Sequence, residues 1–251
     1  MMRAPKWTLL VAAAALVATA AGAQTADEVV EKHLAAMGGR AALSKLTTQT
    51  ATGTITISVQ GADLGGTLEI YHKAPNKART YFKMDLSAMG AGEMVVDQRC
   101  DGKTAYASNS MNGDREITGN QLQAMLNATF PTPLLAYKEA GAKVELAGKE
   151  KIEGRDAHVL VFTPKAGPAS KQYFDAETFM LVRSVSKMDV PEMGGEVEQT
   201  TDVSDYRDVD GMKVPFVLKV STPMQGIAIA LTKVEHNKPI EDAMFSRPGA
   251  K

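Results

Sequence analysis

The chain has 251 residues, of which 44% are hydrophobic, enough to bury the core of one large or two small domains. Its formal net charge of −1 gives no electrostatic reason to expect nucleic acid as a partner. A single cysteine, Cys100, excludes an internal disulfide, so the fold must depend on its core.

Residues 1–23 have the features of an export signal. Arg3 and Lys6 form a positively charged start, an apolar run from Leu9 to Ala18 follows, and Ala21-Gly22-Ala23 supplies the small residues that signal peptidase requires. A membrane-spanning helix would need about 20 apolar residues, and this run is shorter. We therefore expect cleavage near Ala23. The mature chain, residues 24–251, then carries a net charge of about −3, because two cations leave with the signal.

One helix is predicted directly after the signal, from Asp27 to Met37. Thr25 and Glu28 have capping-box spacing, and Gly38-Gly39 provides a left-handed end. The intervening apolar residues form one stripe, so this helix should pack one face against a sheet. A shorter helical segment is predicted from Ala41 to Leu46.

Beyond these helices the apolar residues alternate with polar ones. Ile55, Ile57 and Val59 alternate with Thr54, Thr56 and Ser58, which is typical of a strand with one apolar face. Similar runs follow at residues 68–70, 82–86, 159–162, 214–220 and 227–231. Turn sequences separate the runs: Asp101-Gly102, Asn112-Gly113, Gly154-Arg155-Asp156, Asp175 to Thr178 and Asp210-Gly211. These short connections predict one large antiparallel meander.

An apolar segment interrupts the strand pattern. Leu122, Met125 and Leu126 have helical spacing, and Pro131 and Pro133 then prevent one continuous helix. We expect a short helix, an extended link and a second short helix. This segment is either a plug that closes one end of the sheet or a lid over a hydrophobic pocket.

Methionine is abundant, with 14 residues, and two interpretations are open. The flexible thioethers can fill irregular gaps in a core. Alternatively, Met84, Met94, Met125 and Met180 soften the wall of a cavity that accepts acyl chains.

Sequence motifs for catalysis and metal binding are weak. His33, His72, His158 and His236 stand far apart, without a His-Glu-x-x-His pair, a nucleophile elbow or a phosphate-binding loop. We expect them at the surface or on strand faces, and we expect no catalytic residue, metal ligand or cofactor. The acidic stretch from Asp202 to Gly211 lacks the later glutamate of an EF-hand, which favours a solvated hairpin over a calcium site.

Six segments follow one another in an informative order: Gly66 to Ile70, Lys73-Ala74-Pro75-Asn76, Asp101-Gly102-Lys103-Thr104, Val161 to Lys165, Phe174 to Thr178 and Asp242 to Phe245. Their order resembles that of the LolA family of periplasmic lipoprotein carriers and outer-membrane lipoprotein-sorting proteins, over nearly the whole mature chain. The resemblance implies a single domain of α+β, mainly β class. Its large antiparallel sheet is curved into an incomplete, unclosed β-barrel, with helices covering the concave face.

The resemblance also implies a function. We expect a soluble periplasmic carrier or sensor, not an enzyme, that binds a lipid or lipoprotein acyl chain in a hydrophobic half-barrel cavity. Inner- or outer-membrane lipoprotein-sorting components would be its partners. The chain departs from that family at one position. The family has an arginine directly before the proline, whereas this chain has Ala74 there, flanked by Lys73 and with Arg79 nearby.

Candidate lipid-binding residues are the alternating apolar positions of the sheet and of the interrupted helix. They are Ile55, Ile57, Leu68, Ile70, Phe82, Met84, Met125, Leu126, Phe130 and Leu134. Two alternatives stay open. The same concave surface or a sheet edge can bind a partner protein, or folding can bring Asp205, Arg207 and His236 together in an enzyme site.

Overall fold

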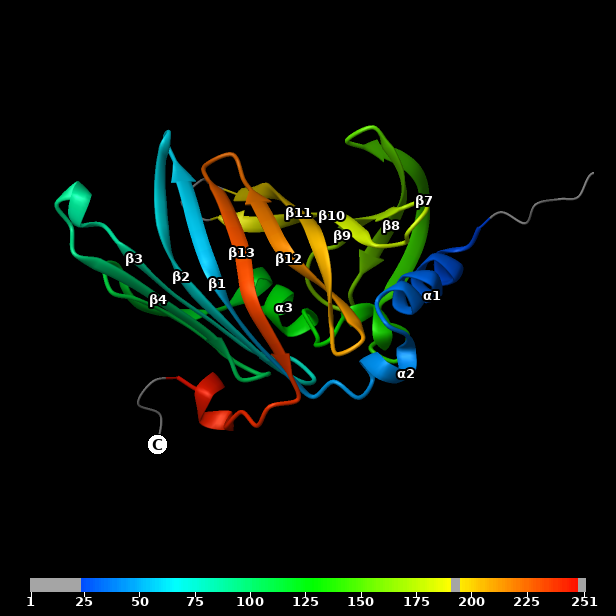
Figure 1. Cartoon of the computed structure of the whole chain (residues 1–251), viewed down its shortest axis with the longest axis horizontal. Helices are drawn as coiled ribbons and strands as arrows, with labels where there is room; N and C mark the ends of the chain where they lie inside the picture. The colour runs from blue at the N-terminus through cyan, green and yellow to red at the C-terminus, as the bar shows by residue number, and fades with distance from the viewer. Residues whose placement is uncertain (1–23, 191–194, 248–251) are drawn as a thin grey trace, which may run out of the picture.

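The computed structural model describes residues 24–190 and 195–247, and the predicted export signal over residues 1–23 lies outside them. Thirteen strands form one antiparallel sheet in the order β6-β5-β4-β3-β2-β1-β13-β12-β11-β10-β9-β8-β7. Within the described residues, β6 and β7 are the two ends of this order and leave the sheet unclosed. Figure 1 shows the sheet curving around the helices. The predicted α+β, mainly β fold with an incomplete barrel is confirmed.

The sheet has two arms. The first contains β1 (Thr48–Val59), β2 (Ala62–Lys73), β3 (Lys77–Asp85), β4 (Glu93–Cys100), β5 (Ala105–Asn109) and β6 (Gly113–Ile117). The second contains β7 (Lys143–Ile152), β8 (Arg155–Thr163), β9 (Ser170–Asp175), β10 (Leu181–Val190), β11 (Gly195–Val209), β12 (Met212–Ser221) and β13 (Gly226–His236). The helices are α1 (Ala26–Ala36), α2 (Arg40–Leu43) and α3 (Gly119–Asn127), with 3-10 turns η1 (Ser87–Met89), η2 (Pro133–Leu135) and η4 (Asp242–Phe245).

The two arms join through β1 and β13, the first and last strands of the chain. The predicted meander is correct within each arm, but the sequence pattern missed this central pairing. Hairpin turns determine local neighbours, whereas nothing local marks the pairing of the two ends. The middle of the chain therefore forms both edges of the sheet, and residues 118–142 must cross from β6 to β7. We call these residues the crossover.

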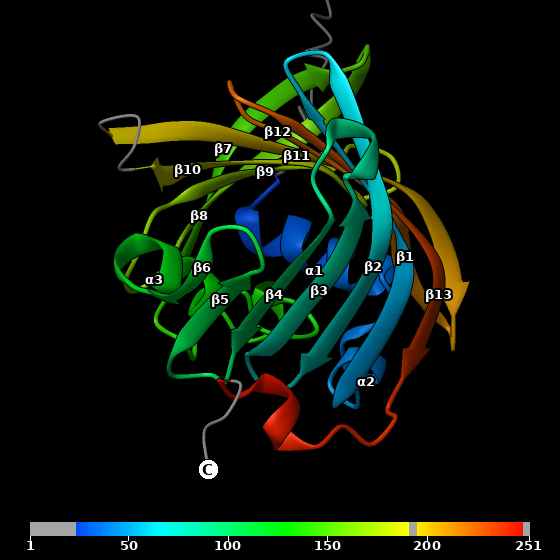
Figure 2. The same cartoon turned by 90° about the vertical axis from the view of Figure 1, so that its left-hand side faces the viewer.

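Helix α1 begins as its sequence predicts. The Thr25 hydroxyl accepts a hydrogen bond from the Glu28 backbone N–H at 3.2 Å, and the Glu28 carboxylate accepts one from the Thr25 N–H at 3.0 Å. These bonds satisfy backbone donors that a helix start would otherwise leave unpaired. Its buried face packs into the second arm, against Leu160 and Phe174. Figure 2 shows α1 inside the hollow of the sheet.

Gly53 marks an irregularity where β1 meets β13. The strand register shifts between Thr52 and Gly53. A Cβ at Gly53 would lie 2.3 Å from the Ala230 carbonyl oxygen, so only glycine fits there. Irregularities of this kind bend a strand and increase its twist, which helps to curve the sheet.

Candidate functional site

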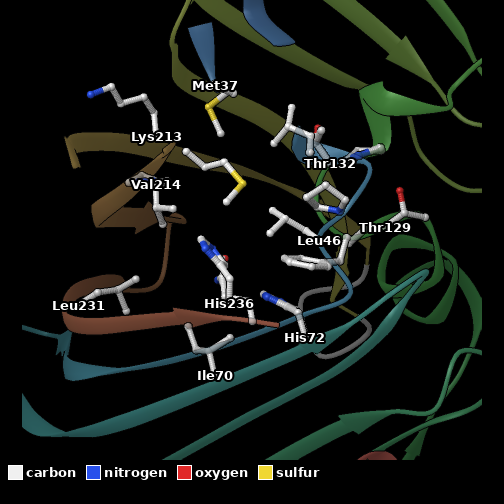
Figure 3. A pocket seen from close by; sticks show the side chains of 18 of the residues that line it. Met37, Leu46, Ile70, His72, Thr129, Thr132, Lys213, Val214, Leu231 and His236 are labelled. Atoms are coloured by element: carbon white, nitrogen blue, oxygen red, sulfur yellow. The ribbon is translucent and has the colours of Figure 1, made fainter. Parts of the chain in front are cut away.

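An apolar cavity of about 390 Å³ lies on the concave side of the sheet. Strands β1, β2, β12 and β13 form its floor, the end of α1 and the region of α2 form one side, and the crossover forms its roof. The volume falls within the range of small-molecule pockets, about 300–1,000 Å³. Figure 3 shows several side chains of its wall, among them Met37, Ile70, Val214 and Leu231.

Three polar side chains lie side by side in this apolar wall. Gln49 on β1 lies opposite His72 on β2 and, on its other side, opposite His236 on β13. Side chains paired in this way across neighbouring strands have Cβ atoms about 4.5–5.5 Å apart. All three line the cavity, and Figure 3 shows both histidines. We call Gln49, His72 and His236 the polar row.

The polar row is incompletely hydrogen-bonded. His236 Nε2 lies 3.3 Å from Gln49 Oε1. Among the described residues, the buried Nδ1 atoms of His72 and His236 have no hydrogen-bond partner, although the Asp210 carboxylate lies 3.4 Å from His236 Nδ1. Burial lowers the pKa of His72 to about 4. Burial also lowers the pKa of His236, and the nearby Asp210 only partly opposes this. Both imidazoles are therefore uncharged at neutral pH.

The roof of the cavity rests on the turn between β2 and β3. Phe130 stacks on the His72 ring, with centroids 5.7 Å apart. Its backbone N–H donates to the Pro75 carbonyl at 2.8 Å, and the Asn76 side chain donates to the Leu126 carbonyl at 3.5 Å. The crossover is thus held at the turn that contains Ala74 and Pro75.

A second cavity of about 350 Å³ lies on the other side of the crossover. Phe130, Thr132 and Pro133 line both cavities. Helix α3 packs Leu122 and Met125 against a small core of β4 to β6. The crossover is therefore a shared wall, which combines features of the plug and of the lid that the sequence suggested.

The ten predicted lipid-binding residues divide into three groups. Ile70 and Phe130 line the larger cavity, Leu126 and Phe130 line the second, and Met125 lines a more polar hollow beside α3.

The second group continues from the cavity floor along the concave face. It consists of Ile55 and Leu68, which are buried, and Ile57 and Phe82, which are partly exposed, and all four share one apolar cluster with Ile70 of the first group. The third group, Met84 and Leu134, is almost fully buried. The six sheet residues share one face, as the alternation predicted, and lipid binding by the ten residues stays a prediction.

Of the four histidines expected at the surface or on strand faces, His72, His158 and His236 lie on strands, whereas His33 lies on α1 and is buried. His33, His158 and His236 are buried, and His72 points into the cavity wall although part of the residue remains accessible. Aromatic partners compensate for some of this burial, because His33 packs against Phe174 and His158 stacks on Phe179.

The methionines that line the larger cavity are Met37 and Met212. Met84, one of the four residues considered for a cavity wall, is buried at 1% exposure.

Sequence reasoning missed the polar row. The pair of Gln49 and His72 had a signal in the sequence. The turn at Gln60-Gly61 places Val59 opposite Ala62, and counting outward from this pair puts Gln49 opposite His72. The pair of Gln49 and His236 depends on the pairing of β1 with β13, for which the sequence offers no local signal.

Arg79 lies on the opposite face of the sheet from the roof. Its guanidinium pairs with Asp97 at 2.7 Å, and Arg99 pairs with the same carboxylate and also donates to the Ser246 carbonyl at 3.0 Å. Burial raises the pKa of Asp97, but the hydrogen bonds from Arg79 and then Arg99 outweigh this effect, so the pKa is lowered. These residues anchor the C-terminal segment.

The acidic stretch forms part of β11 and its turn to β12. Asp205 pairs with Arg207 at 2.6 Å, and Asp208 lies 3.7 Å from Lys213. Within residues 24–190 and 195–247, no group of three His, Cys, Asp or Glu residues is placed to hold a metal ion.

Comparison with known proteins gives a likeness of structure. No family model and no curated protein matches the chain. A DUF1329 family protein from Desulfovibrio piger is similar with a TM-score of 0.57, at 14% identity over 88% of this chain and 97% of that chain. A LolA superfamily protein from Nitrosomonas europaea also has a TM-score of 0.57, at 11% identity over 90% of this chain and 99% of that chain.

A putative outer membrane lipoprotein-sorting protein domain from Vibrio parahaemolyticus has a TM-score of 0.56, at 10% identity over 87% of this chain and 94% of that chain. None of the helices in the described part of the chain is long and apolar enough to cross a membrane. Identities this low establish the architecture alone. The open thirteen-stranded sheet around its helices is therefore a LolA-like fold.

Proposed function

We propose that this protein is a periplasmic carrier or sensor that binds an acyl chain of a lipid or lipoprotein on the concave side of its sheet. It acts by binding and release, without catalysing a reaction. The observation that carries the proposal is an apolar cavity of about 390 Å³ whose wall continues into partly exposed apolar side chains. Soluble proteins seldom leave such surfaces uncovered unless they bind something.

The apolar surface is long enough for an extended chain. Ile57, Ile227 and Ile229 continue the cluster beyond the cavity and remain partly exposed. Burial of each methylene group contributes about 0.8 kcal/mol, so a chain of ten methylenes gains about 8 kcal/mol before the cost of ordering it. Binding therefore needs no covalent step.

The crossover offers a route for entry. Every residue of α3 keeps part of its surface exposed. The connections of the crossover to the β2–β3 turn include the single hydrogen bonds of Phe130 and Asn76. Elements with few buried contacts open locally at low cost in free energy, so we infer that the α3 part of the crossover moves aside when a chain enters or leaves, while the buried Leu134 stays in the core.

The predicted export signal and the structural likeness to a lipoprotein-sorting domain support a task in the periplasm by analogy. Donor and acceptor proteins of a lipoprotein-sorting system are then the partners. The alternative, a module that binds only proteins, predicts a cavity that rejects lipids.

Mass spectrometry of the exported, mature protein tests the proposal. Under native conditions the spectrum should contain a lipid that denaturation releases. Ile70→Glu places a charge in the cavity floor and should abolish lipid retention, because a charge in an apolar site is costly. Thr67→Glu, an exposed change on the opposite face of the same strand, should retain the lipid.

Far-UV circular dichroism confirms that each variant is folded. A folded Ile70→Glu protein that carries lipid like the wild type would contradict the assignment of the cavity. A wild-type protein that is empty and also rejects apolar dyes at micromolar concentration would refute the carrier and favour the protein-binding module.

A further inference from the structure

The polar row is an unusual component of an apolar wall. Its neighbours on the same strands and the same face are apolar: Ala51 on β1, Ile70 on β2 and Val234 on β13. Burying an imidazole nitrogen without a partner costs free energy, and most buried polar groups in proteins are paired. Within the described residues, His72 Nδ1 lacks such a partner, and His236 Nδ1 has only the Asp210 carboxylate, 3.4 Å away. A bound molecule can supply a partner.

We propose that the polar row is a head-group site, and that the cavity takes a single-chain amphiphile whose polar end is an uncharged hydrogen-bonding group such as a hydroxyl. This inference rests on the proposed function and specifies its ligand. A hydroxyl both donates and accepts hydrogen bonds, so it can pair with an imidazole and with the Gln49 amide whichever tautomer each histidine adopts.

The charges around the row disfavour an anionic head group. The Asp210 carboxylate lies 3.4 Å from His236 Nδ1 and would repel a second carboxylate. Among the described residues that line the cavity, Lys213 is the one lysine or arginine, and Asp208 already lies 3.7 Å from its Nζ atom. An ionised group would lose its hydration here without gaining a free cation.

The position of the row sets the direction of the tail. The row lies at one end of the concave apolar surface, and Ile55 and Ile57 continue that surface along β1. The eight residue steps from Gln49 to Ile57 span about 26 Å in an extended strand. A head group at the row therefore leaves its tail on the apolar cluster. The cavity volume suits one such molecule.

A matched pair of variants tests the head-group site. His72→Phe removes the ring nitrogens but keeps an aromatic ring against Phe130. His158→Phe is the control, because His158 is also a buried histidine stacked on a phenylalanine, Phe179, with centroids 5.5 Å apart, and it does not line the cavity. The mature, delipidated protein is titrated with dodecanol, dodecane and dodecanoate in competition with the dye N-phenylnaphthylamine.

We expect His72→Phe to weaken dodecanol binding about fivefold to tenfold, the effect of one hydrogen bond or slightly more. Dodecane binding should be unchanged, His158→Phe should alter neither ligand, and dodecanoate should bind more weakly than dodecanol. If His72→Phe does not fold, Gln49→Leu makes the same test from the centre of the row.

Tighter binding of dodecanoate than of dodecanol would overturn the proposal, and so would equal binding of dodecanol by the wild type and by His72→Phe. In both cases the binding of apolar chains would survive, and only the head-group assignment would fail. If the wild type binds none of the three molecules, the proposed function itself fails.

Discussion

Acid should destabilise this protein through its buried histidines, and His72 allows the effect to be calculated. Its pKa falls from 6.5 in an exposed setting to about 4 in the folded protein, because burial disfavours the charged imidazole. Between these values the unfolded chain takes up a proton that the folded protein does not. The contribution of the uncharged His72 to the free energy of unfolding is therefore fully present above about pH 6.5 and is lost as the pH falls toward 4.

The magnitude follows from the two pKa values. Their difference corresponds to about 3 kcal/mol once the pH is below both of them. Between pH 7 and pH 5 the same relation gives a loss of about 2 kcal/mol from His72 alone. Burial also lowers the pKa of His33, His158 and His236, so the wild type should lose more than this in total.

Urea denaturation of the wild type and of His72→Phe isolates the contribution of His72 to the pH dependence of stability. The other histidines are present in both proteins, so the variant should lose about 2 kcal/mol less than the wild type between pH 7 and pH 5. Far-UV circular dichroism is the suitable probe, because the single tryptophan, Trp7, lies within the predicted signal. Measurements at pH 7 and pH 8 are the control, where the difference between the proteins should hardly change. Parallel losses on acidification would refute the burial of an uncharged His72.

Three further substitutions test the sheet and its outer face. Gly66→Ala should lower the free energy of unfolding by about 2 kcal/mol, because its Cβ would lie 2.1 Å from a backbone oxygen of β3. In the control Gly65→Ala the new Cβ meets open space, so stability should change by less than about 0.5 kcal/mol. Equal effects of the two variants in urea denaturation would contradict this geometry. Asp97→Asn should lower the free energy of unfolding by about 3 kcal/mol, because Arg79 and Arg99 lose their carboxylate partner. The C-terminal segment should then become accessible to limited proteolysis. Unchanged cleavage and stability would show that these ion pairs do not anchor the segment.

The local features of the fold were predictable because their causes are local. The capping box of Thr25 and Glu28 forms as its spacing indicates. The Asp210-Gly211 turn joins β11 to β12, and Ile55 shares its face with Ile57, because neighbouring residues alone determine a turn or an alternation.

The candidate site was less predictable because its parts are distant in sequence. Ile70 and Phe130 were chosen for their apolar character, and both line the cavity. Gln49 and His236 were not chosen, since a polar residue in an alternating strand reads equally well as solvent-facing. Only the register of β1 against β13 shows that His236 lies beside Gln49 on the inward face.

The central pairing of β1 with β13 has a consequence for folding. Each arm consists of strands that pair with their sequence neighbours, so each can form early as a stack of hairpins. The two stacks can join only after the last strand has been synthesised. Because Gln49 and His236 lie on opposite sides of this seam, the polar row does not exist in a partly folded chain. A newly made molecule therefore completes the proposed head-group site only at the final step of its folding.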